Sequence, residues 1–307
     1  MDEFSIIAKY FAPLAGEGAF GLKDDAAIVP QRAGHDLIVT TDAITEGVDF
    51  FAFDPADSIA RKALRVNFSD LAAKGSEPAH YLVNLALPHS ITEQWLAGFA
   101  DGLAQDQKEF GVTLLGGDTG ATEGPLSIAV TAFGFIPSGQ MVRRSGAKVG
   151  DHVYVTGSIG DSGGGLAIFK RENHNLSETD RDSLIACYRV PQPPVDVAPS
   201  LGGIAHASVD VSDGLIADLG HIASASGVRI VVEGERVPLS APLMAFWGDK
   251  AVQRAVVAGD DYQIAFTAPP ALTGPFTHIG WVEAGQGVSL TLNGAEVALP
   301  GRGYRHF

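Results

Sequence analysis

Thiol chemistry is almost absent from this chain of 307 residues, because Cys187 is its single cysteine. One cysteine cannot form an intrachain disulfide or a thiolate metal cluster, so a disulfide scaffold and a zinc–thiolate module are both excluded. The nine histidines include no HExxH or similarly spaced pair, so a zinc hydrolase is disfavoured as well.

Basic residues are also scarce, since 21 Lys and Arg face 36 Asp and Glu and leave a net charge of −15. A nucleic-acid partner needs a basic face, and an anionic membrane surface would repel this chain. Phosphate ligands remain possible where metal cations carry the positive charge. No run approaches the roughly 20 apolar residues of a membrane helix. The acidic start MDEFSIIAKYF has only a short apolar run, so we expect no signal peptide. We therefore expect a cytoplasmic location.

The composition, with 46% hydrophobic and 19% charged residues, describes a globular protein long enough for two domains. Strand and helix patterns alternate in both halves, which predicts an α/β or α+β fold. The polar, glycine-containing passage SGQMVRRSGAKVGD after Pro137 predicts a boundary between domains 1–138 and 139–307. Within the first domain we expect a helix over residues 2–12, a strand at 26–30, and a strand from 112 that stops at Gly116-Gly117-Asp118.

A strand-to-helix junction at residues 207–227 is the most informative stretch. The alternating run 208–211 gives way after Ser212-Asp213-Gly214 to apolar residues at helical spacing, and Ser212 or Asp213 is expected to cap that helix. A helix start of this kind offers N–H groups to phosphate, yet Asp210 and Asp213 would repel bare phosphate, which a metal cation would resolve. The alternative is a strand-end residue beside an ordinary cap.

Other aspartates follow β-rich runs and small residues, and strand ends are where ligands collect in α/β domains. Asp70 differs, since it lies in an otherwise apolar helical stripe. Each aspartate alone is better explained as a cap or turn residue, but the set favours a shared site. Hard oxygen ligands select Mg²⁺, and several such ions would bridge carboxylates to a nucleoside triphosphate. The carboxylates are Asp25, Asp42, Asp70, Asp118, Asp210 and Asp213, with hydroxyls from Thr40, Thr41 and Ser212.

Two further features have weaker signals. The segment GSIGDSGGGLAIF at 157–169 lacks the GK[ST] of a P-loop and the spacing of a dinucleotide fingerprint, so we interpret it as a structural strand–helix turn. Arg143-Arg144 has the chemistry to hold a triphosphate, or is a solvated surface pair.

Taken in order, these motifs resemble the thiamine-monophosphate kinases, of the superfamily that includes aminoimidazole ribotide synthetase and selenophosphate synthetase. The matching segments cover nearly the whole chain: KDDAAIV, TTDAITEGVDF, KALRVNFSDLAAKGSEP, LLGGDT, RRSGAKVGD, VDVSDGLIADLGHIA, AGDDYQI and the terminal GYRHF. The resemblance implies two α/β domains, a homodimer formed through β-strands of the first, and transfer of the γ-phosphoryl group of ATP to thiamine monophosphate.

The resemblance also implies roles for individual residues. Mg²⁺ ligands are expected at Asp25, Thr40, Thr41, Asp42, Asp70, Asp118, Asp210 and Asp213, and ATP contacts at Gly117, Asp118, Arg144 and Ser212. Asp210, Asp42 and Arg144 are expected to be catalytic, and Asp49, Asp260, Tyr304 and Phe307 to contact the acceptor. No base is needed, because an acceptor phosphate oxygen is already ionised at neutral pH.

Two departures lie on the acceptor side, where Asp49 stands for the histidine of EGVHF and Asp260 for the glutamate of GGEDYE. They leave open a different phosphorylated acceptor. Selenophosphate synthetase and a hydrogenase-maturation relative each need a cysteine that this chain does not have in place. A nucleotide-binding protein without turnover is a further alternative, which the intact Asp42, Asp118 and Asp210 disfavour.

Overall fold

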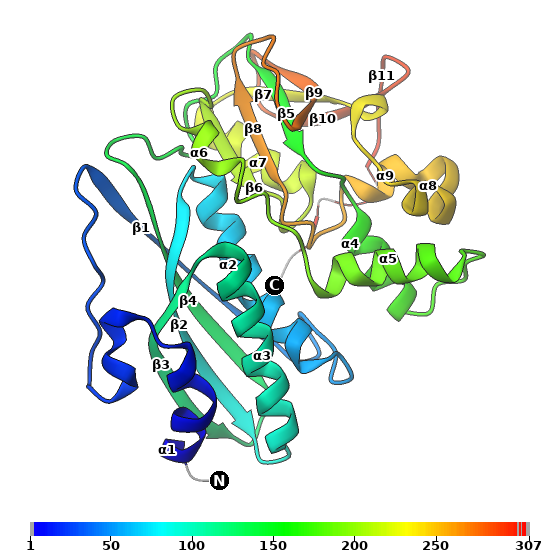
Figure 1. The fold of residues 1–307 in the computed structure, drawn as a ribbon. Coiled ribbons are helices and arrows are strands. Elements are labelled where there is room, and N and C mark those ends of the chain that lie inside the picture. Colours follow the sequence, from blue (N-terminus) through cyan, green and yellow to red (C-terminus); the bar gives the residue numbers. More distant parts are fainter. Residues whose placement is uncertain (1–2, 300, 302, 305–307) are drawn as a thin grey trace. The chain divides into compact units, whose positions relative to one another are not determined.

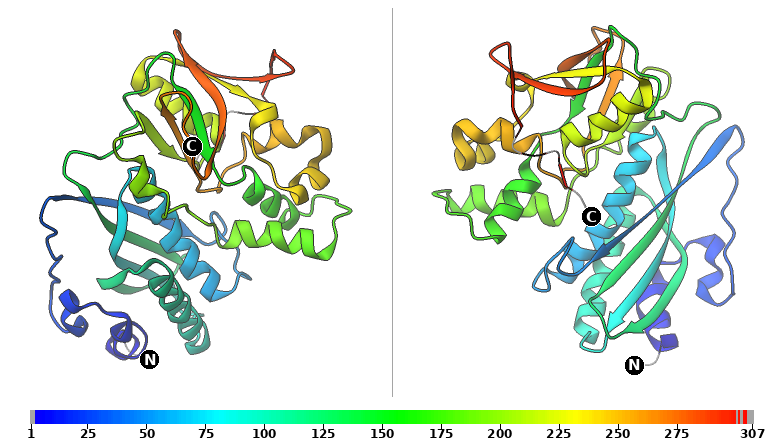
Figure 2. Two further views of the ribbon diagram at one scale, coloured as in Figure 1. Left: turned by 45° about the horizontal axis from the view of Figure 1, so that its top comes forward. Right: turned by 180° about the vertical axis from the view of Figure 1, so that it is seen from behind.

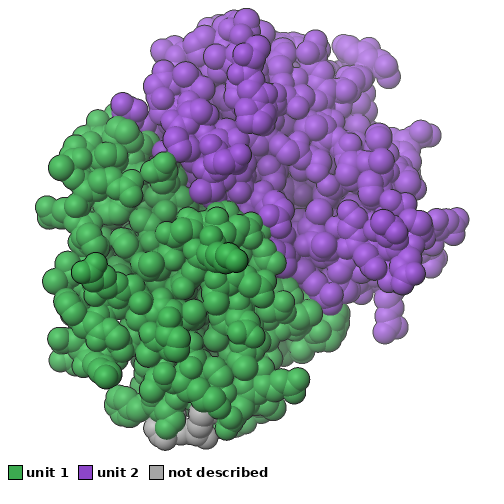
Figure 3. Space-filling model, in the orientation of Figure 1, with its two compact units in different colours: residues 1–71, 76–139 green, residues 72–75, 140–307 purple. Residues whose placement is uncertain are grey.

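The computed structural model describes residues 3–299, 301, 303 and 304. Its internal contacts divide the chain into two compact units, coloured separately in Figure 3. Unit 1 holds Met1–Leu71 and Ser76–Gly139, and unit 2 holds Ala72–Gly75 and Gln140–Phe307. The boundary expected between residues 138 and 139 differs by one residue from this division, and what each domain does stays a prediction.

Unit 1 is built on a four-stranded sheet in the order β1-β4-β2-β3. The strands are β1 (His35–Thr45), β2 (Glu77–Pro88), β3 (Thr113–Thr122) and β4 (Ser127–Pro137). Helices α2 (Ala56–Ala73) and α3 (Glu93–Phe110) cover one face (Figures 1 and 2). Strands β2 and β3 are parallel, with α3 as their crossover, and the other neighbours are antiparallel. This mixed sheet confirms the α/β fold class.

Alternation along β4 explains why the helices pack on that face. Ile128, Val130 and Ala132 are fully buried, while the residues between them are partly exposed. Side chains two residues apart lie on one face of a strand, so the apolar set of β4 points at the helices. Thr92 is the N-cap of helix α3, since its hydroxyl accepts the Trp95 N–H at 3.1 Å.

A buried ion cluster ties the two helices of unit 1 together. Arg65 of α2 and Asp106 of α3 are both 0% exposed, and two guanidinium nitrogens of Arg65 reach the carboxylate at 2.8 Å. Arg61 donates to the same carboxylate at 2.8 Å. A bidentate pair of this kind holds the helices in one register, because a shift along either axis would leave a buried charge unpaired.

The N-terminal segment confirms one expectation and overturns another. It starts as the expected helix, with α1 (Glu3–Ile6) followed by a π-helical turn η1 (Ile7–Phe11) and the 3₁₀ turns η2 (Ala12–Leu14) and η3 (Glu17–Leu22). The strand expected at 26–30 is wrong, because these residues are irregular. The Ile28 N–H bonds to the Gly18 carbonyl at 2.9 Å, a contact between loops, and the Ile28 side chain is 61% exposed.

Unit 2 has a seven-stranded sheet in the order β11-β10-β7-β9-β5-β8-β6. Its strands are β5 (His152–Thr156), β6 (Ala207–Asp210), β7 (Arg229–Glu233), β8 (Ile264–Ala268), β9 (Phe276–Glu283), β10 (Gly287–Leu292) and β11 (Ala295–Val297). Its helices are α4 (Asp161–Phe169), α5 (Glu178–Arg189), α6 (Ala198–Leu201), α7 (Leu215–Ser226), α8 (Ala241–Trp247) and α9 (Ala251–Ala255), with 3₁₀ turns η4 (Gly234–Arg236) and η5 (Gly248–Lys250).

The core of unit 2 lies between this sheet and helix α7. Leu215, Leu219 and Ile222 of α7 are fully buried in one cluster with Val153 of β5 and Ile230 of β7. The helical spacing of these α7 residues is the pattern that predicted the helix. Among the described residues, no helix combines the length and apolar character that a bilayer span requires.

The buried ion cluster leads to a first prediction. Asp106→Ala should lower the free energy of unfolding by about 3–5 kcal/mol, because the buried Arg65 guanidinium loses its buried bidentate partner and keeps only the exposed Glu109 carboxylate, at 2.7 Å. Glu93→Ala removes an exposed pair with Lys9 and should change the free energy of unfolding far less, because solvent screens exposed charges. Urea unfolding of both variants measures the difference, and equal losses would contradict the role given to the buried pair.

Candidate active site

The carboxylates expected at strand ends of unit 1 lie inside strands instead. Asp42 is within β1 and Asp118 within β3, which continues to Thr122. The prediction that β3 stops at Gly116-Gly117-Asp118 is therefore wrong. Pairing with β2, in which Asn84 is registered with Asp118, keeps this polar, glycine-containing sequence extended. Sheet context overrides the weak strand propensity of such residues.

One group of candidate ligands faces helix α2. The Thr40 hydroxyl donates to the Asp70 carboxylate at 2.6 Å, and the Asp42 N–H donates to the Asn67 side-chain oxygen at 3.0 Å. Ile44, two residues beyond Asp42, is buried in the core. Strand alternation therefore places Thr40, Asp42 and Ile44 on the helix-covered face, with Asp70 beside them.

Thr41 belongs to the other face of the sheet. Its hydroxyl donates to the Val130 carbonyl at 3.0 Å and accepts from the Thr131 hydroxyl at 3.2 Å. The structure thus separates the Thr41 side chain from Thr40 and Asp42, although the three residues are consecutive.

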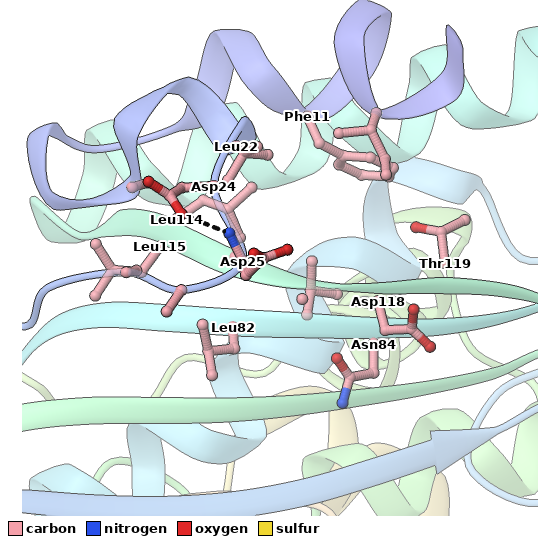
Figure 4. A pocket seen from close by; sticks show the side chains of 17 residues that line it. Phe11, Leu22, Asp24, Asp25, Leu82, Asn84, Leu114, Leu115, Asp118 and Thr119 are labelled. Atoms are coloured by element: carbon pink, nitrogen blue, oxygen red, sulfur yellow. Dashed lines mark hydrogen bonds between the residues drawn. The ribbon is translucent and has the colours of Figure 1, made fainter. Parts of the chain in front are cut away.

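A second group lines a pocket of about 490 Å³ at the other edge of the sheet. Figure 4 shows Asp25, Asp118 and Asn84 around it, with the last two projecting from the face opposite α2 and α3. Apolar side chains from the N-terminal segment and the strands form much of its wall; they include Ile7, Phe11, Leu22, Leu82, Leu114 and Leu115. An apolar wall next to carboxylates suits a ligand with a flat apolar part and a charged part.

The two groups do not meet within one copy of unit 1. Strand β1 and strand β3 are opposite edges of the sheet, with β4 and β2 between them. Three strand spacings of about 4.8 Å separate them by about 14 Å, and Asp42 and Asp118 also lie on opposite faces. One ion cannot bridge these two carboxylates of the same chain.

Gly117 has a backbone conformation in β3 that leaves no room for a side chain against β2. Its φ is +153°, and an added Cβ would lie 1.8 Å from the Val83 carbonyl oxygen. Only a residue without a side chain fits there. Asp118 follows directly in the chain, so this glycine conformation determines where the Asp118 backbone lines the pocket.

The β6–α7 junction of unit 2 is capped differently from the prediction. Gly214 is the N-cap, and neither Ser212 nor Asp213 caps the helix through its side chain. Instead Asp218 of α7 accepts the N–H groups of Ser212, Asp213 and Gly214 at 3.0–3.1 Å. The donors that the sequence suggested for phosphate are thus occupied by a carboxylate.

This junction concentrates negative charge. Asp210 and Asp218 are buried at 4% and 2% exposure, and ligand atoms of Asp213, Asp218 and His221 lie within 4.8 Å of one another. Burial, followed by the charges of Asp210 and Asp213, raises the pKa of Asp218 to about 8, against the lowering effect of the backbone N–H groups. Carboxylate oxygens held so close fit a hard divalent cation, which would relieve their repulsion.

The remaining described candidates for ATP phosphate and acceptor binding lie in loops outside the strands and helices. Arg144 is exposed in the segment before β5, and its carbonyl accepts the Ser226 hydroxyl at 3.5 Å. Asp49 lies in the turn after β1, where its carboxylate accepts the Thr45 N–H at 2.7 Å. Asp260 accepts the Tyr262 hydroxyl at 3.2 Å, and the Tyr304 N–H bonds to the Asp213 carbonyl at 2.9 Å. Phe307 lies outside the described residues.

The glycine-rich turn at 157–169 is structural, as the sequence predicted. The N–H groups of Gly160 and Ser162, at the start of α4, bond to the carboxylate of Asp261 at 2.6 and 3.3 Å. Burial raises the pKa of Asp261 well above its ordinary value, and these two N–H groups oppose that rise. A phosphate would have to displace a buried carboxylate to bind there.

Sequence reasoning missed Asn84, Asp218 and Asp261. Asp218 follows Leu215 by three residues and precedes Leu219 and Ile222 on the buried side of α7. A charge in an apolar stripe is the signal that identified Asp70, and it would have identified Asp218 as well. Asn84 and Asp261 have no comparable signal, because their partners are distant in sequence.

Residues 23–136 match the model of the AIR synthase related protein N-terminal domain, and residues 148–293 match the C-terminal domain of the same family. The thiamine-monophosphate kinase of Salmonella typhimurium is 39% identical over 99% of this chain and 98% of its own length. The chain belongs to the thiamine-monophosphate kinase family. The family expectation, and with it the expectation of a kinase, is confirmed.

Solved structures agree with this family in fold. The thiamine-monophosphate kinase of Stenotrophomonas maltophilia K279a has a TM-score of 0.86 and 37% identity, covering 97% of this chain and 98% of that one. AaThiL complexed with AMPPCP and TMP has a TM-score of 0.82 and 33% identity, covering 94% and 97% of the two chains. The two-domain architecture expected for this kinase family is thereby confirmed.

The close contact at Gly117 gives a second prediction. Gly117→Ala should abolish nucleotide binding and destabilise unit 1 by about 1–3 kcal/mol or more, because the new Cβ overlaps the Val83 carbonyl. Gly120→Ala in the same strand is the control, since nothing lies within 4 Å of its added Cβ. Thermal unfolding and nucleotide titration measure both effects, and an intact Gly117→Ala protein would refute the close approach.

Proposed function

We propose that this chain transfers the γ-phosphoryl group of ATP to the phosphate of thiamine monophosphate, giving thiamine diphosphate, with several Mg²⁺ ions and in-line geometry. The observation that carries the proposal is the pocket of unit 1, whose apolar wall suits a nucleobase and whose rim holds Asp25 and Asp118. The related AaThiL was solved with AMPPCP and TMP, an ATP analogue and a phosphorylated acceptor in one protein.

The donor chemistry fits magnesium. The candidate ligands in both units are mostly carboxylate and hydroxyl oxygens, with a His221 ring nitrogen beside Asp213 and Asp218. The charges of Asp210 and Asp213 raise the pKa of Asp218, and a cation would relieve this repulsion. Asp25 and Asp118 would hold Mg²⁺ at the pocket, Asp42 and Asp70 on the α2 side, and Asp210 and Asp213 in unit 2. When bound, the ions neutralise charge on the transferring phosphoryl group.

The residues of the chain then act by positioning and by charge. Phosphoryl transfer has a loose transition state with little covalent chemistry for protein groups to perform. The acceptor oxygen is already ionised, so no side chain has to remove a proton. Arg144, exposed and cationic, is proposed to neutralise charge on the ATP phosphates, and Gly117 and Ser212 to contact them with their backbone and side chain.

We also propose that the chain works as a homodimer formed through the sheet of unit 1. Strand β1 is an edge strand on which Leu37 and Val39 are 47% and 59% exposed. Exposed apolar edges are unfavourable unless they are paired or covered. A second copy whose β1 approached β3 would also bring its Asp42 toward Asp118, which one chain keeps at opposite edges.

Acceptor identity is the direct test of the proposed function. Incubation with ATP, Mg²⁺ and thiamine monophosphate should yield thiamine diphosphate and ADP in equal amounts. Chromatography of the reaction mixture measures both products. Without acceptor, ADP should stay at background. If the chain binds ATP but forms no thiamine diphosphate, its acceptor is a different phosphorylated molecule. Asp49 and Asp260 would then be suited to that acceptor.

Metal binding in unit 2 has its own prediction. Asp210→Asn should lower turnover at low Mg²⁺ by about two orders of magnitude, because it removes charge from the transition-state environment. It should also reduce the thermal stabilisation that Mg²⁺ gives. Asp249→Asn makes the same chemical change at an exposed position and should alter neither. Unchanged turnover in Asp210→Asn would exclude this residue from the site.

A further inference from the structure

Loop 259–262, which carries Asp260, is joined to the segment after β6 by backbone contacts. The Asp260 N–H bonds to the Ser212 carbonyl at 2.8 Å, and the Tyr262 N–H to the Val211 carbonyl at 2.7 Å. An added Cβ at Gly259 would lie 2.6 Å from that same Ser212 oxygen. A displacement of this loop would therefore displace the segment that holds Ser212 and Asp213.

The loop has a conformation that it would not adopt alone. Asp260 and Tyr262 have φ values of +70° and +52°, in the left-handed region that side chains disfavour. Strain of this kind costs about 1–3 kcal/mol per residue and persists only where the surroundings impose it. Something must therefore hold the residue between them.

Asp261 provides that anchor. It is 5% exposed, and its two carboxylate oxygens accept the N–H groups of Gly160 at 2.6 Å and Ser162 at 3.3 Å. These donors begin the nine-residue helix α4, whose other buried N-terminal acid is Asp161. A carboxylate at a helix N-terminus is favoured by the orphan N–H groups and by the helix dipole.

We propose that Asp261 is a positioning residue for the phosphoryl acceptor, which fixes loop 259–262 on the start of α4 and so sets Asp260 relative to Ser212 and Asp213. The proposal rests on the function proposed above, in which Asp260 is on the acceptor side and Asp213 holds a cation. Asp261 itself does not contact the reacting atoms. The competing explanation is a cap that only stabilises α4.

Asp161 provides a matched control for that explanation. It is 7% exposed in the same helical turn, and its carboxylate accepts the hydroxyls of Ser158 and Ser240, each at 2.5 Å. Neither partner belongs to loop 259–262. A role in stability alone predicts similar effects of Asp161→Ala and Asp261→Ala, whereas positioning predicts that only the second affects the acceptor.

The kinetic experiment compares Asp261→Ala, Asp261→Asn and Asp161→Ala in the full chain. Asp261→Ala should lower kcat/KM for thiamine monophosphate about 10- to 100-fold, as expected for a misplacement of about 1 Å, and KM for ATP should rise by a smaller factor, because the loop is bonded to the segment that holds Ser212. Asp261→Asn keeps a carbonyl oxygen for Gly160 and should recover part of the loss. Equal acceptor effects in Asp161→Ala and Asp261→Ala, or none in either, would overturn the proposal.

A second measurement does not depend on turnover. In hydrogen exchange, Asp261→Ala should accelerate the amides of Asp260 and Tyr262, which do not bond to the deleted carboxylate, and Asp161→Ala should not. Unchanged protection in Asp261→Ala overturns the positioning role whatever the activity. If the wild-type chain makes no thiamine diphosphate but the protection is lost as expected, the proposed function fails, and the anchoring of the loop by Asp261 is upheld.

Discussion

Compensation of carboxylate charge is the constraint on which this structure depends. A chain with a net charge of −15 places aspartates inside the protein, and a buried carboxylate is stable only when donors or cations surround it. Asp106 is neutralised by Arg65 and Arg61. Asp218 and Asp261 are held by backbone N–H groups at the starts of α7 and α4. These three are structural acids, and each has its donors within the fold.

The candidate metal ligands differ from these acids, because other carboxylates or solvent surround them. Asp210 and Asp213 raise the pKa of Asp218, so the β6–α7 junction has more negative charge than its three backbone N–H groups compensate. Asp25 and Asp118 are exposed at a pocket. Asp106 and Asp261 have compensating groups within the fold, whereas the proposed function assigns cations to Asp25, Asp118, Asp210 and Asp213.

The sequence predicted the elements well where periodicity was strong. The change from alternation to helical spacing located β6 and α7. It failed where long-range pairing decides the structure. Gly116-Gly117-Asp118 looks like a loop, and parallel pairing with β2 makes it a strand. The run at 26–30 looks like a strand, and it has no place in the sheet order.

The spatial grouping of the candidate residues could not be predicted from the sequence. The face of a strand on which a side chain lies follows from alternation, yet the register that puts Thr40 and Asp42 toward α2 depends on β4, which comes about 90 residues later. Asp261 was unpredictable for the same reason, since its donors precede it by about 100 residues. Local patterns identify residue types, and only tertiary pairing assigns them a partner.

Capping by Asp218 and Asp261 occupies two helix N-termini that could otherwise bind phosphate. Helix N-termini are common phosphate sites, but those of α7 and α4 already hold carboxylates. In the proposed function, triphosphate binding therefore relies on cations and on exposed basic side chains such as Arg144. An ionised acceptor oxygen needs no base, so the same positive charges that bind the donor also lower its repulsion from the acceptor. In the proposed function, the same positive charges therefore serve both ATP binding and phosphoryl transfer.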